Sequence, residues 1–275
     1  MSIALVRRVL AGSALTALVV LLSACASGSL PQGGTPRESV ETRPVSPNPG
    51  DPERRAQARL ELASLYFSRG QHQTALDEIA QALAARPDLP EAVALQALVR
   101  AATGDIAGAE SSFARAMRLA PGDGNVIHNH GWFLCQQRRF GEAHAAFEKA
   151  LAAPRYDGQS RTLLAQGVCM AREERWAEAE RALSRSYEFD PANPVTAYNL
   201  AEVLLRRGEL ARARFYVGRV NAVPEQVNAQ SLWLAARIER RLGNLDAVRD
   251  LGRQMRERFP QAPETLLFER GRFDD

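Results

Sequence analysis

The stretch ALDEIAQALAARP at residues 75–87 is followed 34 positions later by AESSFARAMRLAP at residues 109–121. Both stretches start with a small residue, carry a large apolar residue four positions later, and end in proline. The pattern recurs in six places, which begin at Ala75, Ala109, Ala143, Ala179, Ala213 and Val248, although in the last one Gly252 replaces the large apolar residue. Self-similarity at a fixed period of this length is the sequence signature of a stacked repeat architecture. The sequence therefore predicts a fold built of six stacked units.

Each unit is predicted to contain two antiparallel helices. Prolines near the unit ends stop the second helix because proline cannot continue it, and these are Pro87, Pro121, Pro154, Pro191, Pro224 and Pro260. Glycine marks the turn between the two helices in four of the six units, at Gly70, Gly104, Gly208 and Gly243. Strand-like alternation of apolar and polar residues does not occur at useful length in the sequence.

These landmarks resemble the tetratricopeptide repeat. The resemblance implies an all-α fold, a right-handed superhelical solenoid of six repeats over residues 53–275, in which each unit buries its apolar face against its neighbours. The last stretch, from Pro263 to Phe273, is predicted to form a short capping helix over the sixth repeat. Proline suits the first position of a helix, and a terminal repeat needs a cover.

Residues 1–24 are predicted to be a lipoprotein signal peptide. Arg7 and Arg8 precede an apolar stretch from Val9 to Leu22, which is short for spanning a bilayer core of about 30 Å and is typical of a secretory signal. The alternative is an ordinary cleaved signal in which the cysteine that follows it is incidental.

The tetrapeptide Leu22-Ser23-Ala24-Cys25 resembles the bacterial lipobox. The resemblance implies that Cys25 is acylated and becomes the new N-terminus, and several acyl chains make such an anchor effectively permanent. Ala26 follows Cys25 where inner-membrane retention often uses aspartate. We therefore expect the chain to be anchored in the outer membrane, facing the oxidising periplasm.

Residues 25–52 are predicted to be the lipidated cysteine and a disordered tether. Positions 26 to 52 hold six prolines, four glycines and four serines, and such a composition buries too little apolar surface to order itself. In an extended conformation the tether would reach roughly 80 Å, at about 3.1 Å per residue.

The charge balance gives no support for a nucleic-acid partner. The chain has a formal net charge of +3 and a pI near 9.0, but two of the arginines, Arg7 and Arg8, belong to the predicted signal peptide. Removing residues 1–24 leaves 33 basic and 32 acidic residues, or +1. Lys149 is the only lysine, and this arginine bias is more typical of a GC-rich genome than of a polyanion-binding surface.

The sequence contains no constellation typical of an enzyme. It has no glycine-rich phosphate loop, no G-x-S-x-G and no H-E-x-x-H. We therefore expect no catalysis, cofactor or small-molecule substrate. His128, His130, Cys135 and His144 are the nearest approach to a metal site. His128 and His130 lie two positions apart on a helix and point to different faces, so no metal site is predicted.

Cys135 and Cys169 fall near the middle of the first helices of units three and four. First helices of adjacent units pack at about 8–10 Å between their axes, so the two side chains can meet. An oxidising compartment favours a disulfide that staples the two repeats, whereas the alternative is a pair of buried free thiols.

A partner-binding groove is predicted on the first helices of the first three units. Its residues are Leu60, Ser64 and Phe67, then Ala94, Leu98 and Ala101, then His128 and Trp132. This apolar face suits an amphipathic helix or an extended peptide. The sixth unit places Arg237, Arg240 and Arg241 on the same face, which could receive an acidic segment. If the assumed register of the repeat is wrong by one residue, all these side chains would instead lie in the core between repeats.

Several segments resemble the type IV pilus biogenesis and stability lipoproteins. They are Asn129-His130-Gly131-Trp132-Phe133-Leu134-Cys135, Pro154-Arg155-Tyr156, Gly167-Val168-Cys169, and Phe259-Pro260 with Glu264. Departures from the family pattern are His130 in place of tyrosine, Gln166 in place of asparagine and Pro263 in place of serine. The match covers essentially the whole mature chain.

The resemblance implies a pilotin, a protein that helps the pilus secretin subunit reach the outer membrane and assemble into its ring. A lipid anchor, a tether and a peptide-binding solenoid suit this role, since tethering raises local concentration. One alternative is a periplasmic adaptor that recruits peptidoglycan enzymes through the same kind of groove. Another is an accessory domain of an enzyme.

Overall fold

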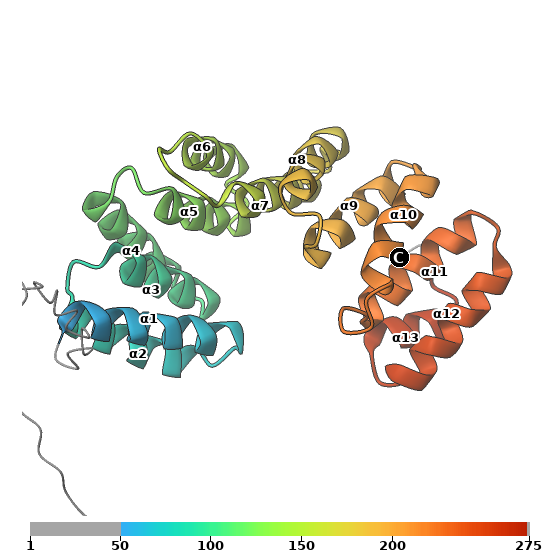
Figure 1. Ribbon diagram of the computed structural model, residues 1–275, viewed down its shortest axis with the longest axis horizontal. Coiled ribbons are helices and arrows are strands. Elements are labelled where there is room, and N and C mark those ends of the chain that lie inside the picture. The colour runs from blue at the N-terminus through green and yellow to red at the C-terminus, as the bar shows by residue number, and fades with distance from the viewer. Residues whose placement is uncertain (1–50, 274–275) are drawn as a thin grey trace, which may run out of the picture. The chain divides into compact units, whose positions relative to one another are not determined.

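The computed structural model describes residues 51–273, and within this range the chain forms helices and no strand (Figure 1). The helices are α1 (Pro52–Ser68), α2 (His72–Ala85), α3 (Pro90–Ala102), α4 (Ile106–Leu119), α5 (Gly124–Gln136), α6 (Phe140–Leu151), α7 (Gln159–Arg172), α8 (Trp176–Phe189), α9 (Pro194–Arg206), α10 (Leu210–Asn221), α11 (Ala229–Arg241), α12 (Leu245–Arg258) and α13 (Pro263–Glu269). Among the described residues, none of the helices combines the length and the hydrophobicity that a membrane span requires.

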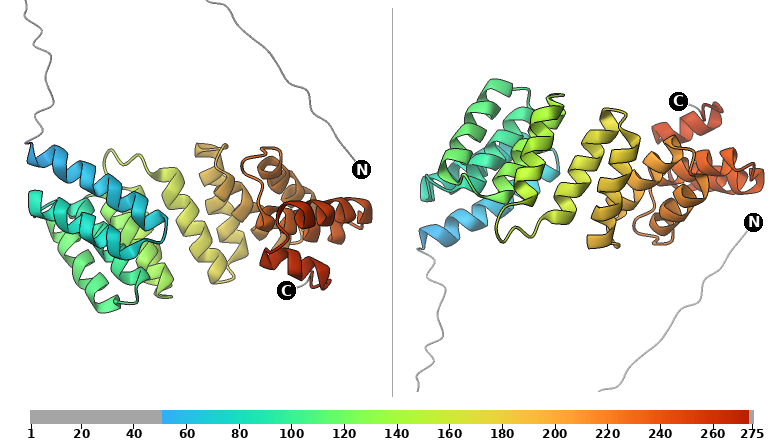
Figure 2. Two further views of the ribbon diagram at one scale, coloured as in Figure 1. Left: turned by 90° about the horizontal axis from the view of Figure 1, so that it is seen from below. Right: turned by 90° about the horizontal axis from the view of Figure 1, so that it is seen from above.

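The helices pack as six antiparallel pairs, from α1 with α2 to α11 with α12, and each pair stacks on the next. Figure 2 shows the pairs following one another in chain order. First helices also contact each other, α3 with α5, α5 with α7, and α7 with α9. In Figure 1, α5 and α7 lie on the inner side of the curve and α6 and α8 on its outer side. The predicted all-α repeat fold is confirmed.

The spacing of small and large residues that recurs from unit to unit explains how each helix pair packs together. Ala109 and Ala143 are fully buried, as are the large residues Phe113 and Phe147. At Gly131 an added Cβ would lie 2.9 Å from the ring of Phe147, so a side chain there would push α5 and α6 apart. Each second helix ends two or three residues before the unit's proline, as the prolines predict.

The turn inside each unit uses a left-handed backbone conformation. Gly208 and Gly243 have φ values of 77° and 76°, which glycine adopts without steric cost. In units three and four the same turn is made by Arg138 and Glu174, both at φ 60°. This explains why glycine marks only four of the six turns in the sequence.

The first helix begins at Pro52, one residue before the predicted boundary. The Asp51 side chain accepts a hydrogen bond from the backbone N–H of Glu53 at 3.0 Å, and proline at the first helical position completes the cap. The predicted signal peptide, the lipidated Cys25 and the tether up to residue 50 lie outside the described residues.

At the other end, α13 packs on α11 and α12 as a cap. It ends at Glu269, earlier than the predicted Phe273. Trp233 of α11, Phe268 of α13 and Phe273 form an aromatic cluster with ring centroids 4.9 to 6.3 Å apart. Through this cluster, the C-terminal residues cover the apolar surface that the last repeat would otherwise expose.

Candidate partner-binding groove

A cavity of about 280 Å³ opens along the first helices of units three to five. Its lining is apolar with one histidine and one arginine, and consists of His128, Trp132, Arg161, Leu164, Ala165, Val168 and Val195. These residues belong to α5, α7 and the start of α9. We refer to this set of residues as the inner groove.

Helical spacing brings the lining together. His128 and Trp132 lie four positions apart on α5, and Leu164 and Val168 lie four positions apart on α7, so each pair projects from one face of its helix. Trp132 and Leu164 remain partly exposed. The inner groove therefore presents an indole and two aliphatic side chains to solvent between two packed helices.

Two exposed arginines flank this apolar surface. The guanidinium of Arg172 lies over the Trp132 ring, 5.2 Å from its centroid. Arg161 lines the inner groove directly and donates a hydrogen bond to Asn125 Oδ1 at 2.6 Å. The arrangement suits a peptide that combines an apolar side chain with a carboxylate.

His128 is a fixed polar residue at the wall of the inner groove. It is buried, and its Nδ1 lies 2.9 Å from the Thr162 hydroxyl, which is itself 2.6 Å from the Tyr156 hydroxyl. Burial, with the positive charge of Arg161, lowers the pKa of His128 to about 3. The imidazole is therefore neutral at physiological pH, so it contributes a polar but uncharged surface to the inner groove.

The other residues predicted for the groove lie elsewhere. Ala94 is fully buried in the core around Phe113, so its prediction as a groove residue is wrong. Leu60 and Phe67 pack against the core of Ala63 and Ala75, and Leu98 packs against the core around Phe113. All three are partly buried, as Trp132 is, but they do not line the inner groove, so their part in partner binding stays a prediction.

The arginines of the sixth unit all contact other residues of the chain. Arg237 pairs with Glu202 at 3.3 Å and donates to the backbone oxygen of Phe273 at 3.2 Å. Arg240 stacks on the Phe273 ring, 4.4 Å from its centroid. Arg241 donates to the backbone oxygen of Leu205. Arg237 is largely buried and already paired, whereas Arg240 and Arg241 stay exposed, so an acidic segment at these two side chains remains a prediction.

The sequence analysis did not predict five residues of the lining, Arg161, Leu164, Ala165, Val168 and Val195. Leu164 and Val168 are the two that the repeat could have revealed. They occupy in the fourth unit the same frame positions that His128 and Trp132 occupy in the third. The repeat period itself was the signal that could have found them.

A disulfide joins Cys135 of α5 to Cys169 of α7, with the Cα atoms 5.9 Å apart. Cys135 follows Trp132 by three positions, and Cys169 is adjacent to Val168. The bridge therefore ties together the two helices that form the walls of the inner groove.

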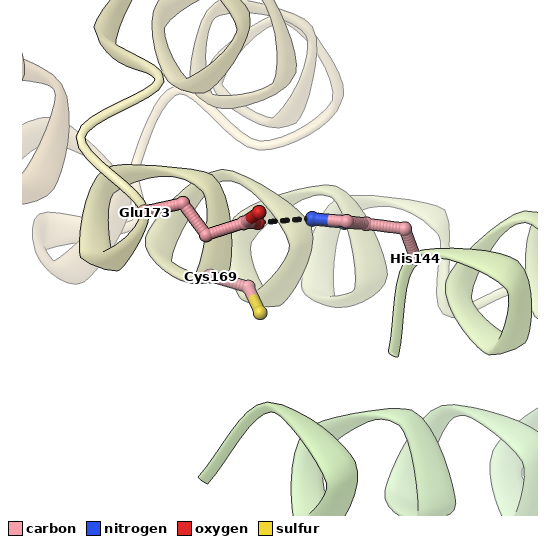
Figure 3. Close-up of side chains that lie close together, drawn as sticks. All are labelled: His144, Cys169 and Glu173. Carbon is pink, nitrogen blue, oxygen red and sulfur yellow. Dashed lines mark hydrogen bonds and ion pairs between the residues drawn. The ribbon is translucent and has the colours of Figure 1, made fainter. Parts of the chain in front are cut away.

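A second polar cluster lies beside this disulfide. Nε2 of His144 on α6 contacts Oε1 of Glu173, which caps the end of α7 (Figure 3). Glu173 also lies 3.6 Å from Arg175. Ligand atoms of His144, Cys169 and Glu173 are all within 4.8 Å of one another. The sequence does not predict a role for Glu173, because only the packing of α6 against α7 brings it to His144.

Tetratricopeptide repeat models match the chain at residues 54–124 and 130–194, and at residues 170–237. The chain is 25% identical over 253 residues to the type IV pilus assembly protein PilF of Pseudomonas aeruginosa, covering 92% of this chain and 97% of that protein.

Two solved structures are similar as well. The crystal structure of PilW, described as a widely conserved type IV pilus biogenesis factor, superposes with a TM-score of 0.68 at 29% identity, over 77% of this chain and 96% of PilW. A structure of Pseudomonas aeruginosa PilF gives a TM-score of 0.65 at 23% identity, over 80% of this chain and 99% of PilF. These matches confirm the resemblance that the sequence motifs indicate.

Proposed function

This chain belongs to the tetratricopeptide repeat family, in the group related to the pilus biogenesis proteins PilF and PilW, and we propose that it acts as a pilotin. As a non-enzymatic lipoprotein at the periplasmic face of the outer membrane, it would bind the type IV pilus secretin subunit. In this way it would assist the localisation and multimerisation of the secretin.

The observation that carries the proposal is the inner groove. Trp132, Leu164 and Val168 form an apolar surface next to Arg161, with Arg172 stacked on the indole. An extended peptide or amphipathic helix can place an apolar side chain between α5 and α7 and a carboxylate near either guanidinium. Such a site holds a protein segment and needs no turnover.

Anchoring makes a modest intrinsic affinity sufficient. Acylation of Cys25 would hold the solenoid at the membrane, and the tether would let it search the surrounding periplasm. Confining both partners to one membrane surface raises their effective concentration, so the second contact becomes nearly intramolecular.

The proposal is tested in cells by Leu164→Glu and Val168→Glu, which place a carboxylate in the apolar surface. The matched control is Phe215→Glu on α10, where a large apolar side chain is already 57% exposed and does not line the inner groove. We expect the groove variants, but not the control, to lose secretin multimers and surface pili at normal protein levels.

Normal secretin multimers in both groove variants would overturn the pilotin proposal. If those variants instead changed cell-wall hydrolysis while secretin rings formed normally, the peptidoglycan adaptor would be the better account.

A further inference from the structure

Three side chains with metal-binding atoms converge where units three and four meet, and a disulfide holds a fourth, Cys135, against one of them. The four residues are Cys135 on α5, His144 on α6, Cys169 on α7 and Glu173 at the end of α7. Figure 3 shows His144 and Glu173 pointing toward each other, with the sulfur of Cys169 close by. This cluster does not include His128 or His130, which point to different faces of one helix and therefore did not predict a metal site.

Helix geometry explains the convergence. Cys169 and Glu173 are four positions apart, so they lie above one another on one side of α7. His144 approaches from the second helix of the preceding unit, and the disulfide brings Cys135 to the same place. Three helices of adjacent repeats thus contribute to one cluster.

The distances are close to those of a zinc site. In a tetrahedral site with bonds of about 2.0–2.3 Å, neighbouring ligand atoms stand about 3.3–3.8 Å apart. The ligand atoms of His144, Cys169 and Glu173 already lie within 4.8 Å of each other. Side-chain adjustments of about 1 Å would close the set around an ion.

Hydrogen bonding explains only part of this cluster. Nε2 of His144 contacts Glu173, but the buried Nδ1 has no partner among the described residues. His144 and Glu173 side chains are only 13% and 19% exposed, which is low for a surface ion pair. Glu173 is also held by Arg175, which orients the carboxylate from outside.

We propose that the reduced form of this protein binds one Zn²⁺ ion through the thiolates of Cys135 and Cys169, a ring nitrogen of His144 and a carboxylate oxygen of Glu173. Thiolate, imidazole and carboxylate are the ligands that Zn²⁺ takes in proteins. The disulfide and the ion are alternative links between α5 and α7, and the ion adds α6 to the link. This inference does not depend on the identity of the protein partner.

The chemistry balances through thiol–disulfide exchange. A dithiol reductant gives two electrons and two protons to the Cys135–Cys169 bond and becomes a disulfide itself. Each cysteine thiol then loses a proton when its sulfur binds the ion. Oxidation of the two thiolates by a disulfide donor reforms the bond and releases Zn²⁺.

The test uses the full chain reduced with a water-soluble phosphine, which is then removed without oxygen. Calorimetry with Zn²⁺ should show one ion per reduced chain, with proton release, and none per oxidised chain. Titration with Co²⁺ should give a thiolate-to-cobalt charge-transfer band. His144→Ala and Glu173→Gln should each weaken Zn²⁺ binding at least about tenfold, since even outer residues of zinc sites have effects of that size.

The matched control is His72→Ala, which removes a histidine from the start of α2 and should leave Zn²⁺ binding unchanged. Cys135→Ser supplies a second route, because it frees the Cys169 thiol without a reductant. This variant should still show the charge-transfer band through Cys169.

Two results would overturn the inference. One is a reduced chain that remains helical and takes up no Zn²⁺, or that binds it equally well in His144→Ala. The other is a chain that unfolds on reduction and is not refolded by Zn²⁺, because an ion that binds the native state must stabilise it.

Discussion

The ring of Phe268 occupies the space that a side chain at Gly252 would fill. A Cβ added to Gly252 would lie 2.1 Å from the Phe268 ring. The other five units carry a large apolar residue at this position. In the last repeat, the Phe268 side chain of the capping helix therefore fills the space that the repeat's own large residue fills in the other units.

We therefore expect Gly252→Ala to destabilise the protein by about 1–3 kcal/mol, because the added methyl group must displace Phe268. The matched control is Gly218→Ala on α10, where an added Cβ meets nothing within 4 Å. That substitution should stabilise the protein by up to about 1 kcal/mol through helix propensity. Urea unfolding measures both, and effects of the same sign would contradict this account of the cap.

Arg138 and Glu174 are exposed residues in the left-handed turns of units three and four. Glycine adopts this conformation without the steric cost that other residues pay, which is about 1–2 kcal/mol. After the larger entropy loss of glycine is subtracted, Arg138→Gly and Glu174→Gly should each raise the free energy of unfolding by about 0.5–1 kcal/mol. Replacing the existing turn glycine, Gly208→Ala, should lower it. A loss of stability in both glycine variants would show that their side chains make contacts of their own.

The Cys135–Cys169 bridge closes a loop with a sequence separation of 34 residues. Its removal in the double variant Cys135→Ser, Cys169→Ser should lower the free energy of unfolding by about 2–4 kcal/mol. Thermal or urea unfolding of the oxidised chain and the variant, both without added metal, measures the difference. Equal midpoints would mean that helix packing alone fixes α5 against α7.

Burial of His128 makes stability depend on pH. The pKa of this ring is lowered to about 3 in the folded protein from 6.5, so below pH 6.5 the unfolded chain binds a proton that the folded chain does not. Stability is therefore fully present above pH 6.5 and falls as the pH drops toward 3, by up to about 1.4 kcal/mol per pH unit.

The variant His128→Gln keeps a polar group for Thr162 and does not titrate. It should show a smaller loss of unfolding free energy between pH 7.5 and pH 5 than the unmodified chain. Part of the slope should remain, because burial and the nearby Arg139 charge also lower the pKa of His130. An unchanged slope would mean that His128 is hydrated in solution.

The repeat landmarks were sufficient to predict the fold, because a period near 34 residues with fixed small, large and proline positions allows few other architectures. The end of each second helix followed from its proline. The turns at Arg138 and Glu174 could not be read from composition, since neither residue favours the left-handed region. Gly252 could be seen as an exception, but only packing against Phe268 gives the reason.

The groove was harder to predict than the fold. On a first helix, neighbouring positions in the sequence point in different directions, toward the solvent or toward the next unit, so an error of one residue in the assumed register changes the prediction. Ala94 lies on the buried side. Trp132 lines the inner groove, and its neighbours Leu164 and Val168 come from the following unit. Glu173 reaches His144 only through contacts between units, which no local pattern encodes.

Site-specific photo-crosslinking in cells shows whether the inner groove binds the secretin. A photoreactive residue at Leu164 lies in the inner groove, whereas one at Phe215 on α10 is exposed outside it. The account predicts a covalent adduct with the secretin subunit from position 164 and none from position 215. A secretin adduct from position 215 alone, or from neither position in cells that assemble normal secretin rings, would contradict it.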